Sequence, residues 1–203
     1  MNTVVLRPSR AAYLRTLRAN AVIGGILLVV VIVRALLNPV CLIVLVVTVA
    51  ISIGAVIFYF RTTRIEFADG RYTLHRWGMA RTFLAADVQV VLTLDQYRVN
   101  YNLLAPQLIV IGNGARRLLR LGGTTWGTEA LGPIANDMMA RGVAHEHVAE
   151  PITPGQLNER FPYAVGWAER HPVLLGLAIA LGVIVLVTLI VIVGLVLSQS
   201  GLS

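Results

Sequence analysis

Two neighbouring histidines, His145 and His147, are the residues whose type and spacing most directly suggest a metal ion. Side chains two residues apart lie on one face of a strand, so both imidazoles could reach one ion. A zinc site needs three or four ligands, and no second cluster of His or Cys accompanies the pair. The helical H-E-x-x-H arrangement is also missing, because Ala149 stands where its second histidine would be. We therefore expect no metal and no cofactor, and we interpret the pair as part of an exposed polar linker.

The turn Gly112-Asn113-Gly114, followed by Arg116 and Arg117, has the composition of a phosphate-binding loop. Such a loop needs a strand before the glycines and a helix N-terminus after them, because the helix supplies the N–H groups that meet the phosphate. Here the apolar pattern predicts a strand on both sides. A hairpin turn explains the glycines better.

General acid–base or nucleophilic chemistry has no recognisable centre in this chain. The serines are terminal or lie in apolar runs, and the acids show no pairing with His or Ser: Glu66, Asp69, Asp87, Asp95, Glu129, Asp137. The long apolar runs contain no Asp, Glu, Lys or His, which disfavours a transporter. The polar stretch Arg61–Arg170 holds twelve Arg and ten acids, so nucleic acid is not an expected partner. We expect no enzymatic activity.

Five arginines are the best candidates for contact with anionic lipid or with a protein partner: Arg61, Arg64, Arg116, Arg117 and Arg120. Near an anionic membrane each well-placed charge contributes about 1 kcal/mol. On a regular strand, Arg116 and Arg120 would share a face and Arg117 would point the other way. Plain flanking charge without a specific ligand is the alternative that the sequence leaves open.

The composition places these residues in a membrane protein. Of 203 residues 57% are hydrophobic and 13% are charged, and the mean hydropathy is +0.76. Three apolar runs, about 19–37, 40–60 and 173–197, meet the ~20 residues that cross a hydrocarbon core. The expected organisation is a basic N-terminus (1–18), a transmembrane hairpin (19–60), a β domain (61–142), a linker with an interfacial helix (143–171), and a third transmembrane helix with a short outer tail (172–203).

Arginines on both sides of the first two runs indicate the orientation. Arg lies at positions 7, 10, 15 and 18 and again from Arg61 onward. The positive-inside rule therefore predicts a protein of the cell (inner) membrane whose N-terminus and β domain are cytoplasmic and whose C-terminus lies on the outer side. Phe60, Trp77 and Trp167 are the candidate interfacial anchors, because aromatic rings favour the headgroup level.

The polar stretch shows strand periodicity first and helix periodicity later. Asp69-Gly70 predicts a type I′ hairpin turn, Asp87 a cap at a bend, and 88–94 a strand with alternate apolar residues on one face. Leu131, Ile134, Ala135 and Met138 have the spacing of one buried helical stripe. Gly132-Pro133 predicts the start of that helix and Gly142 its end.

This order of helices, short strands and one amphipathic helix resembles bacterial pleckstrin-homology-like membrane proteins over Ala19–Gly142. The family's opening hairpin is similar to Arg61–Leu74 (RTTRIEFADGRYTL), and its strand–Asp–strand stretch to Phe83–Val91 (FLAADVQVV), which departs from the family pattern at Ala85-Ala86. The resemblance implies a bent antiparallel sheet or partial barrel capped by a C-terminal helix. It implies a binding or scaffolding module with no catalytic residues.

The sequence thus predicts a non-enzymatic membrane protein with three transmembrane helices and a cytoplasmic domain that binds or scaffolds at the membrane face. The main alternative is an accessory subunit of a larger membrane complex, whose helices make the contacts. Small residues four apart, such as Ala50 and Gly54, would allow close helix packing. The oligomeric state and the identity of the partner stay open at this level.

Overall fold

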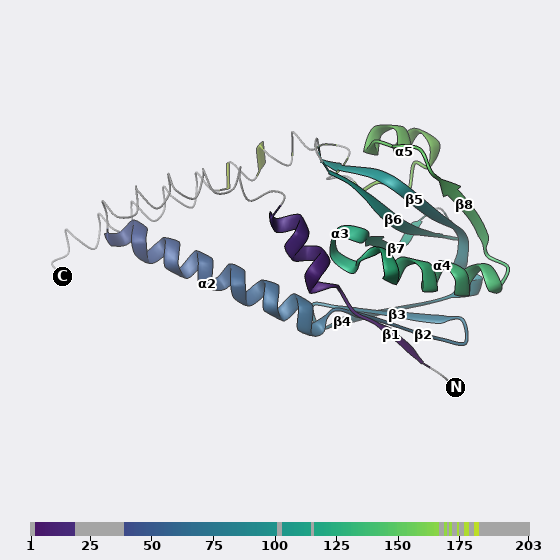
Figure 1. Ribbon diagram of the computed structural model, residues 1–203, viewed down its shortest axis with the longest axis horizontal. Helices are drawn as coiled ribbons and strands as arrows, with labels where there is room; N and C mark the ends of the chain where they lie inside the picture. The colour runs from purple at the N-terminus through teal and green to yellow at the C-terminus, as the bar shows by residue number, and fades with distance from the viewer. Residues whose placement is uncertain are drawn as a thin grey trace.

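The computed structural model describes residues 3–18, 39–100, 103–114 and 116–166, and seven single positions beyond them: 169, 171, 174, 177, 178, 181 and 182. The described chain is an α+β body of two four-stranded sheets, from which one long helix projects (Figure 1).

Sheet A is a meander of four antiparallel strands in the order β1 (Val4–Leu6), β2 (Arg64–Ala68), β3 (Arg71–Arg76), β4 (Met79–Leu84). The type I′ turn at Asp69-Gly70 is confirmed, since both residues have positive φ, 48° and 79°. Trp77-Gly78 makes a second turn of this kind, with φ of 53° and 78°. Strand β1 was not predicted, because three residues are too few to show a period.

A short 3-10 turn, η1 (Ala85–Asp87), carries the chain from sheet A into sheet B. The Asp87 carboxylate accepts a hydrogen bond from the Leu84 backbone N–H at 3.0 Å, and the Asp87 carbonyl accepts one from the Asn113 N–H at 2.8 Å. The predicted capping role of Asp87 is confirmed. The turn ends pairing with β4, so the next strand starts a separate sheet.

Sheet B has the order β7 (Arg116–Gly122), β6 (Leu103–Gly112), β5 (Val88–Asn100), β8 (Ala144–Val148). The first three strands pair antiparallel, and β8 pairs parallel to β5. The Gly112-Asn113-Gly114 turn joins β6 to β7 as a hairpin, as predicted. Strand β5 has register shifts, the first between Val88 and Val90. Val88 therefore packs with Val91 on one face, while Val90, Leu92 and Leu94 pack on the other.

The two faces of sheet B bury two different cores. Between the sheets, side chains such as Tyr72 of sheet A and Leu108 of sheet B pack with the helix α4 (Leu131–Ala140). On the far face, Leu92 and Ile109 pack with Leu157 and Val165 from the chain's later part. Burial on both faces explains why 108–112 is a continuous apolar run with no polar alternation.

Helix α4 follows two short turns, α3 (Gly123–Trp126) and η2 (Thr128–Ala130). Its predicted stripe is confirmed: Leu131, Ile134, Ala135 and Met138 are its buried residues. The helix begins at Leu131, before Gly132-Pro133, because η2 leads directly into it. It ends near the predicted stop, where Gly142 has a φ of 80° and its N–H donates to the Met139 carbonyl.

One polar contact joins α4 to sheet A across this core. The hydroxyl of Tyr72, a fully buried residue, donates to the Asp137 carboxylate at 2.5 Å, and Arg141 donates to the same group at 3.0 Å. Burial alone would raise the pKa of the Asp137 carboxyl, but the hydrogen bonds from Arg141 and Tyr72 outweigh it and lower the pKa below its ordinary value.

This pair predicts a specific acid sensitivity. A carboxyl whose pKa is lowered by folding stabilises the protein fully above its ordinary pKa of about 3.9, and that stabilisation is lost as pH falls through the lowered value. We expect Asp137→Asn to reduce the free energy of unfolding at neutral pH by about 1 kcal/mol, and to flatten its pH dependence below about pH 4. Urea unfolding of the full chain in mild detergent measures both. An unchanged slope in that range would contradict the assignment.

The segment expected to be a linker, 143–171, contributes to the body as far as it is described. It contains β8 and the helix α5 (Pro154–Arg160), and Ile152 bridges to Tyr97 of β5. Thr153 is the N-cap of α5, because its Oγ1 accepts a hydrogen bond from the Gln156 N–H at 3.3 Å. Leu157 is fully buried against sheet B.

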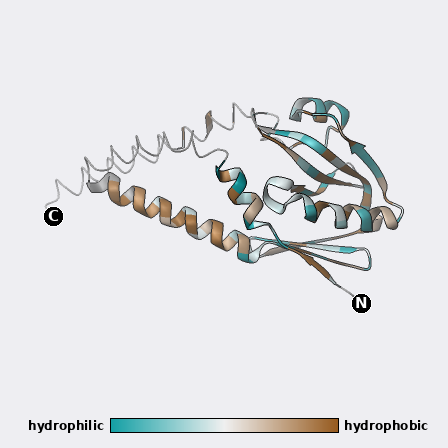
Figure 2. Cartoon of the chain, in the orientation of Figure 1, coloured by the Kyte–Doolittle hydropathy of each residue, from teal (hydrophilic) through white to brown (hydrophobic). Residues whose placement is uncertain are grey.

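The C-terminal end of helix α2 (Pro39–Thr62) lies at the body, next to the start of β2, and the rest of the helix extends away from the body (Figure 1). Its apolar colouring continues along most of its length (Figure 2). Within the described residues it is the one helix long and apolar enough to cross a membrane, by length and composition. Its window Leu45–Thr62 has a mean hydropathy of 1.9, and none of that window is buried inside the protein.

The predicted fold of three transmembrane helices below one bent sheet or partial barrel is therefore wrong. The strands form two separate sheets because η1 interrupts the pairing after β4. One candidate membrane helix is found in the described ranges, where three spans were expected. The hydropathy of those runs shows that they are apolar, but it does not show that each forms a membrane-spanning helix. The first predicted span, 19–37, and most of the third, 173–197, lie outside the described residues.

Candidate functional site

The end of α2 meets both sheets, and three adjoining hollows lie at this junction. We call the first the junction cavity, the second the arginine hollow and the third the apolar groove, and together the junction site. The junction cavity and the arginine hollow share Leu74 and Arg76. The apolar groove shares Tyr59 with the cavity and Trp77 with the hollow. Elements far apart in sequence, from residue 13 to residue 126, therefore line three neighbouring hollows.

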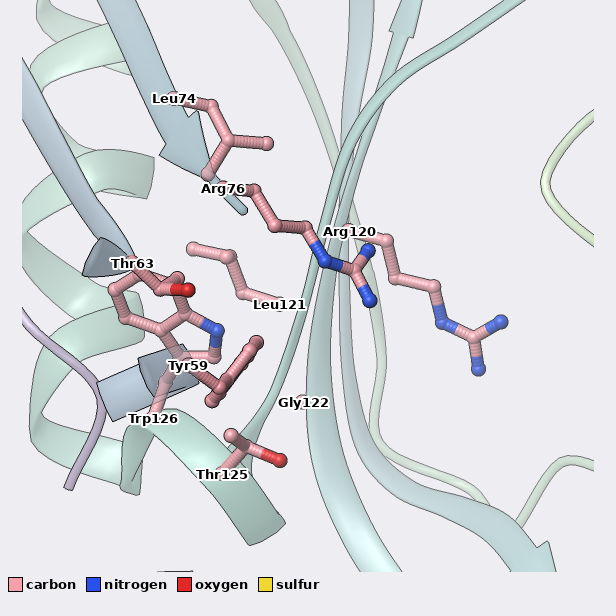
Figure 3. A pocket seen from close by; sticks show the side chains of 9 residues that line it. All are labelled: Tyr59, Thr63, Leu74, Arg76, Arg120, Leu121, Gly122, Thr125 and Trp126. Atoms are coloured by element: carbon pink, nitrogen blue, oxygen red, sulfur yellow. The ribbon is translucent and has the colours of Figure 1, made fainter. Parts of the chain in front are cut away.

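The junction cavity has a volume of about 180 Å³ and lies between α2, β3 and the β7–α3 connection (Figure 3). Its lining comprises Tyr59, Thr63, Leu74, Arg76, Arg120, Leu121, Gly122, Thr125 and Trp126. One water occupies about 30 Å³ of liquid, so the cavity can hold a group larger than water. The guanidinium of Arg76 lies in the middle of the view, whereas that of Arg120 points away from the cavity (Figure 3).

Thr63 is the most unusual residue of this cavity. It is 1% exposed, yet its Oγ1 atom has no hydrogen-bond partner. Most buried hydroxyls in proteins are paired, and leaving one unpaired costs about 1–3 kcal/mol. Its hydroxyl points toward the cavity (Figure 3). The position therefore has an unpaired donor at the wall of the cavity, closed to solvent in this conformation.

The strand register explains why arginines line the second hollow. Tyr72 pairs with Phe83, and the next positions on that inner face pair Leu74 with Arg81 and Arg76 with Met79. The inner face of sheet A thus changes from apolar to basic toward α2. The arginine hollow, about 360 Å³, is lined by Leu74, Arg76, Trp77, Met79 and Arg81. Among the described residues, no carboxylate lies within 4.0 Å of either guanidinium, since neither arginine takes part in an ion pair.

The apolar groove, about 200 Å³, runs beside the last turns of α2 and is lined by Tyr13, Ala55, Val56, Tyr59, Phe60 and Trp77. Aromatic contacts build it: the Tyr13 and Phe60 rings are 5.3 Å apart, and Trp77 lies 5.9 Å from both Phe58 and Tyr59. The junction site therefore combines a basic, hydroxyl-bearing part with an apolar part. Its lining residues include no Asp, Glu, His or Cys.

Two of the five predicted arginines, Arg117 and Arg120, lie on the face of sheet B that is turned away from sheet A. Both lie close to Glu169 there. Arg120 forms a hydrogen-bonded ion pair with Glu169, donates to the Gln107 Oε1 at 2.8 Å, and stacks 5.0 Å from the Tyr97 ring centre. Arg117 donates to the Ala164 carbonyl at 3.2 Å and lies 4.0 Å from Glu169.

A bulge explains why Arg117 shares a face with Arg120, against the expectation from regular alternation. Val110 pairs with Leu119 but Ile111 pairs with Arg117, so Leu118 is an extra residue in β7. Burial would lower the pKa of the Arg120 guanidinium, but Glu169 outweighs it and raises the pKa above its ordinary value. Arg120 is therefore charged and held by partners within the body.

The other three predicted arginines are dispersed. Arg61 is exposed in the last turn of α2, and Arg116 is exposed at the start of β7. Arg64 lies on sheet A, where its Nε is 2.5 Å from Glu66. The structure does not gather the five into one patch.

Of the predicted anchors, Phe60 and Trp77 both line the apolar groove. Trp77 is 43% exposed at the tip of the β3–β4 hairpin. Trp167 lies outside the described residues.

The two histidines of the metal hypothesis lie on β8, not in an open linker. His145 Nε2 is 2.8 Å and His147 Nδ1 is 3.1 Å from the Thr93 hydroxyl, and His147 lies 3.4 Å from Asp95. No group of three or more metal-ligating side chains is found in the part of the chain that the structure describes. These contacts hold β8 against β5.

Sequence reasoning missed Thr63, Arg76 and Arg81 as site residues. A signal for the arginines was present: Tyr72 and Leu74 continue with Arg76 in steps of two, so one inner position of the strand is basic. Thr63 gave no signal, because a hydroxyl at the end of a helix is ordinary until its surroundings are known.

Comparisons with protein-family models, with curated proteins and with solved structures find no match to this chain. Function is therefore inferred from the junction site and from α2.

Proposed function

We propose that the protein is a non-enzymatic module that α2 holds at a membrane, and that its two-sheet body binds or scaffolds at that surface. The observation that carries this proposal is the exposure of α2. Ile43, Val46, Ile51 and Ile53 are 63%, 59%, 65% and 55% exposed on a helix without a polar face. Exposed apolar area costs about 25 cal/mol per Å² in water, and a hydrocarbon surrounding removes that cost.

The length of α2 supports the same reading. Its 24 residues span about 36 Å at 1.5 Å per residue, against a hydrocarbon core of ~30 Å. A core helix of a water-soluble protein would be buried by its own chain, but none of the Leu45–Thr62 window is buried here. A cleaved signal is disfavoured as well, because β1 precedes α2 and pairs with β2 after it. Cleavage within α2 would remove an edge strand of sheet A.

The pairing of β1 with β2 also supports the proposed orientation. It places residues 4–6 and 64–68 in one sheet, so the basic segment before α2 and the body after it lie on the same side of the membrane. Arg7, Arg10, Arg15 and Arg18 then join Arg61 on that side. The positive-inside rule makes this the cytoplasmic side.

A role as an accessory subunit is the second candidate, and the open surface of α2 favours it. A Cβ added at Gly54 would meet no atom within 4 Å, so a partner helix could approach there closely. Stable co-purification of one partner in mild detergent, lost on Gly54→Leu, would support this role. Purification as a single species would exclude it.

Washing membranes from expressing cells at alkaline pH tests membrane attachment by α2. We expect the full chain to stay in the pellet after both a high-salt and an alkaline wash, because apolar insertion does not depend on charge. Release by either wash would overturn the proposal.

A further inference from the structure

We propose that the junction site binds one anionic phospholipid, with its phosphate between Arg76 and Arg81 and an acyl chain along the apolar groove; phosphatidic acid serves as the probe. This inference rests on the proposed function, because it assumes that the end of α2 lies at a membrane surface. Of the five predicted arginines only Arg120 lines this site, and its guanidinium points away from the cavity (Figure 3).

The charge of the site selects an anion. Arg76 and Arg81 line the arginine hollow on neighbouring strands, and no acidic residue lines any of the three hollows. Guanidinium groups bind phosphate oxygens through paired N–H donors, and such bonds are about twice as strong as neutral ones. Arg117 and Arg120 are held by Glu169, whereas Arg76 and Arg81 make no ion pair among the described residues.

The buried hydroxyl of Thr63 is an independent sign of a ligand. It is nine-tenths buried or more, it faces the junction cavity, and it has no partner. A phosphate oxygen held by Arg76, which lines the same cavity, would supply the missing acceptor. The cost of the unpaired group is then recovered when the ligand binds.

The apolar groove decides between a lipid and a soluble anion. It shares Tyr59 with the cavity and Trp77 with the arginine hollow, so a molecule with its head at Arg76 meets apolar side chains next to it. Ala55 and Val56 continue the groove up the exposed helix toward the apolar phase. A lipid has this succession of charged head and apolar chain; inorganic phosphate uses only half of the site.

Tryptophan fluorescence of the full chain in neutral detergent provides the test, because Trp77 and Trp126 line the site. The probes are short-chain phosphatidic acid, diacylglycerol with the same chains, and inorganic phosphate. We expect saturable binding of phosphatidic acid at least about tenfold tighter than that of either other probe. Equal affinity for diacylglycerol would overturn the role of the arginines, and equal affinity for phosphate would overturn the lipid.

Variants sharpen this test. We expect Arg76→Gln with Arg81→Gln to weaken phosphatidic acid binding at least about tenfold. Arg71→Gln with Arg98→Gln removes the same charge from exposed positions outside the junction site and should change it less than about twofold. Equal losses in both pairs would show non-specific attraction and overturn the proposal.

Thr63→Val distinguishes a binding role from a structural one. We expect weaker binding, by about threefold to tenfold, together with a higher urea midpoint for the ligand-free protein, because an unpaired buried hydroxyl has been removed. Unchanged binding, or a lower midpoint, would contradict the role given to Thr63. Retention in washed membranes without phosphatidic acid binding would refute this inference while leaving the proposed function intact.

Discussion

Leu157→Ala should destabilise the body by about 2–5 kcal/mol, as expected for a leucine removed from a packed core. Leu157 is fully buried on the far face of sheet B, in contact with a core that includes Leu92 and Ile109. The capping box at Thr153 fixes the helix that carries it. Urea unfolding of the full chain in mild detergent, followed by circular dichroism, measures the loss.

Leu104→Ala is the matched control, because Leu104 is 45% exposed on β6. It should change the free energy of unfolding by less than about 0.5 kcal/mol. Equal effects of the two substitutions would mean that residues 144–165 behave as a tether and not as part of the body. The same result would remove β8 and α5 from the folding unit.

Tyr72→Ala should cost about 3–5 kcal/mol, the range for a large aromatic residue removed from a core. The Tyr72 ring lies between those of Phe67 and Phe83, at 5.9 and 5.2 Å, and its hydroxyl reaches Asp137 of α4. One side chain thus joins sheet A to the helix packed against sheet B. Loss of the ring should weaken the packing between these layers more than loss of any single contact within a sheet would.

Tyr72→Phe separates the ring from the hydroxyl in this prediction. It keeps the stacking and removes the bond to Asp137, so we expect a loss of about 1–2 kcal/mol. Tyr163, 57% exposed, supplies the aromatic control, and Tyr163→Ala should be nearly neutral. A Tyr72→Ala effect no larger than that of Tyr163→Ala would refute the two-layer core.

Local signals in the sequence predicted local structure well. Asp69-Gly70 specified its turn because few other residues accept positive φ at both positions. The stripe from Leu131 to Met138 specified the buried face of α4. These features depend on residues near one another in the chain, which is where periodicity and turn chemistry act.

Long-range pairing was not predictable in the same way. Strand β1 pairs with β2 across about 60 residues, and β8 joins β5 in parallel after an intervening helix. Burial on both faces of sheet B depends on α5, which the sequence shows only as a short capped segment. The two sheets follow from these distant partners, whereas the single bent sheet was expected from the family resemblance.

The sequence indicated which types of residue to expect at the candidate site, but not which arginines line it. Basic and aromatic residues near the end of the second apolar run were expected at a membrane surface, and Phe60 and Trp77 do line the junction site. The single extra residue at Leu118 turned Arg117 toward Glu169 and Ala164. A bulge of one residue leaves no trace in the pattern, and of the arginines chosen from sequence only Arg120 lines the site.

The central claim, that α2 lies in hydrocarbon while the body lies in water, can be measured with two spin labels. Each is placed on a single cysteine in a Cys41→Ala background, one at Ile51 and one at Asp69, in the full chain reconstituted into lipid vesicles. Collisions with apolar oxygen and with a water-soluble nickel chelate are then compared at each label. We expect oxygen to dominate at residue 51 and the chelate to dominate at residue 69, because Ile51 is 65% exposed on an apolar helix and Asp69 is exposed at a hairpin turn. Collisions dominated by the chelate at residue 51, or low collisions with both reagents there, would contradict the account.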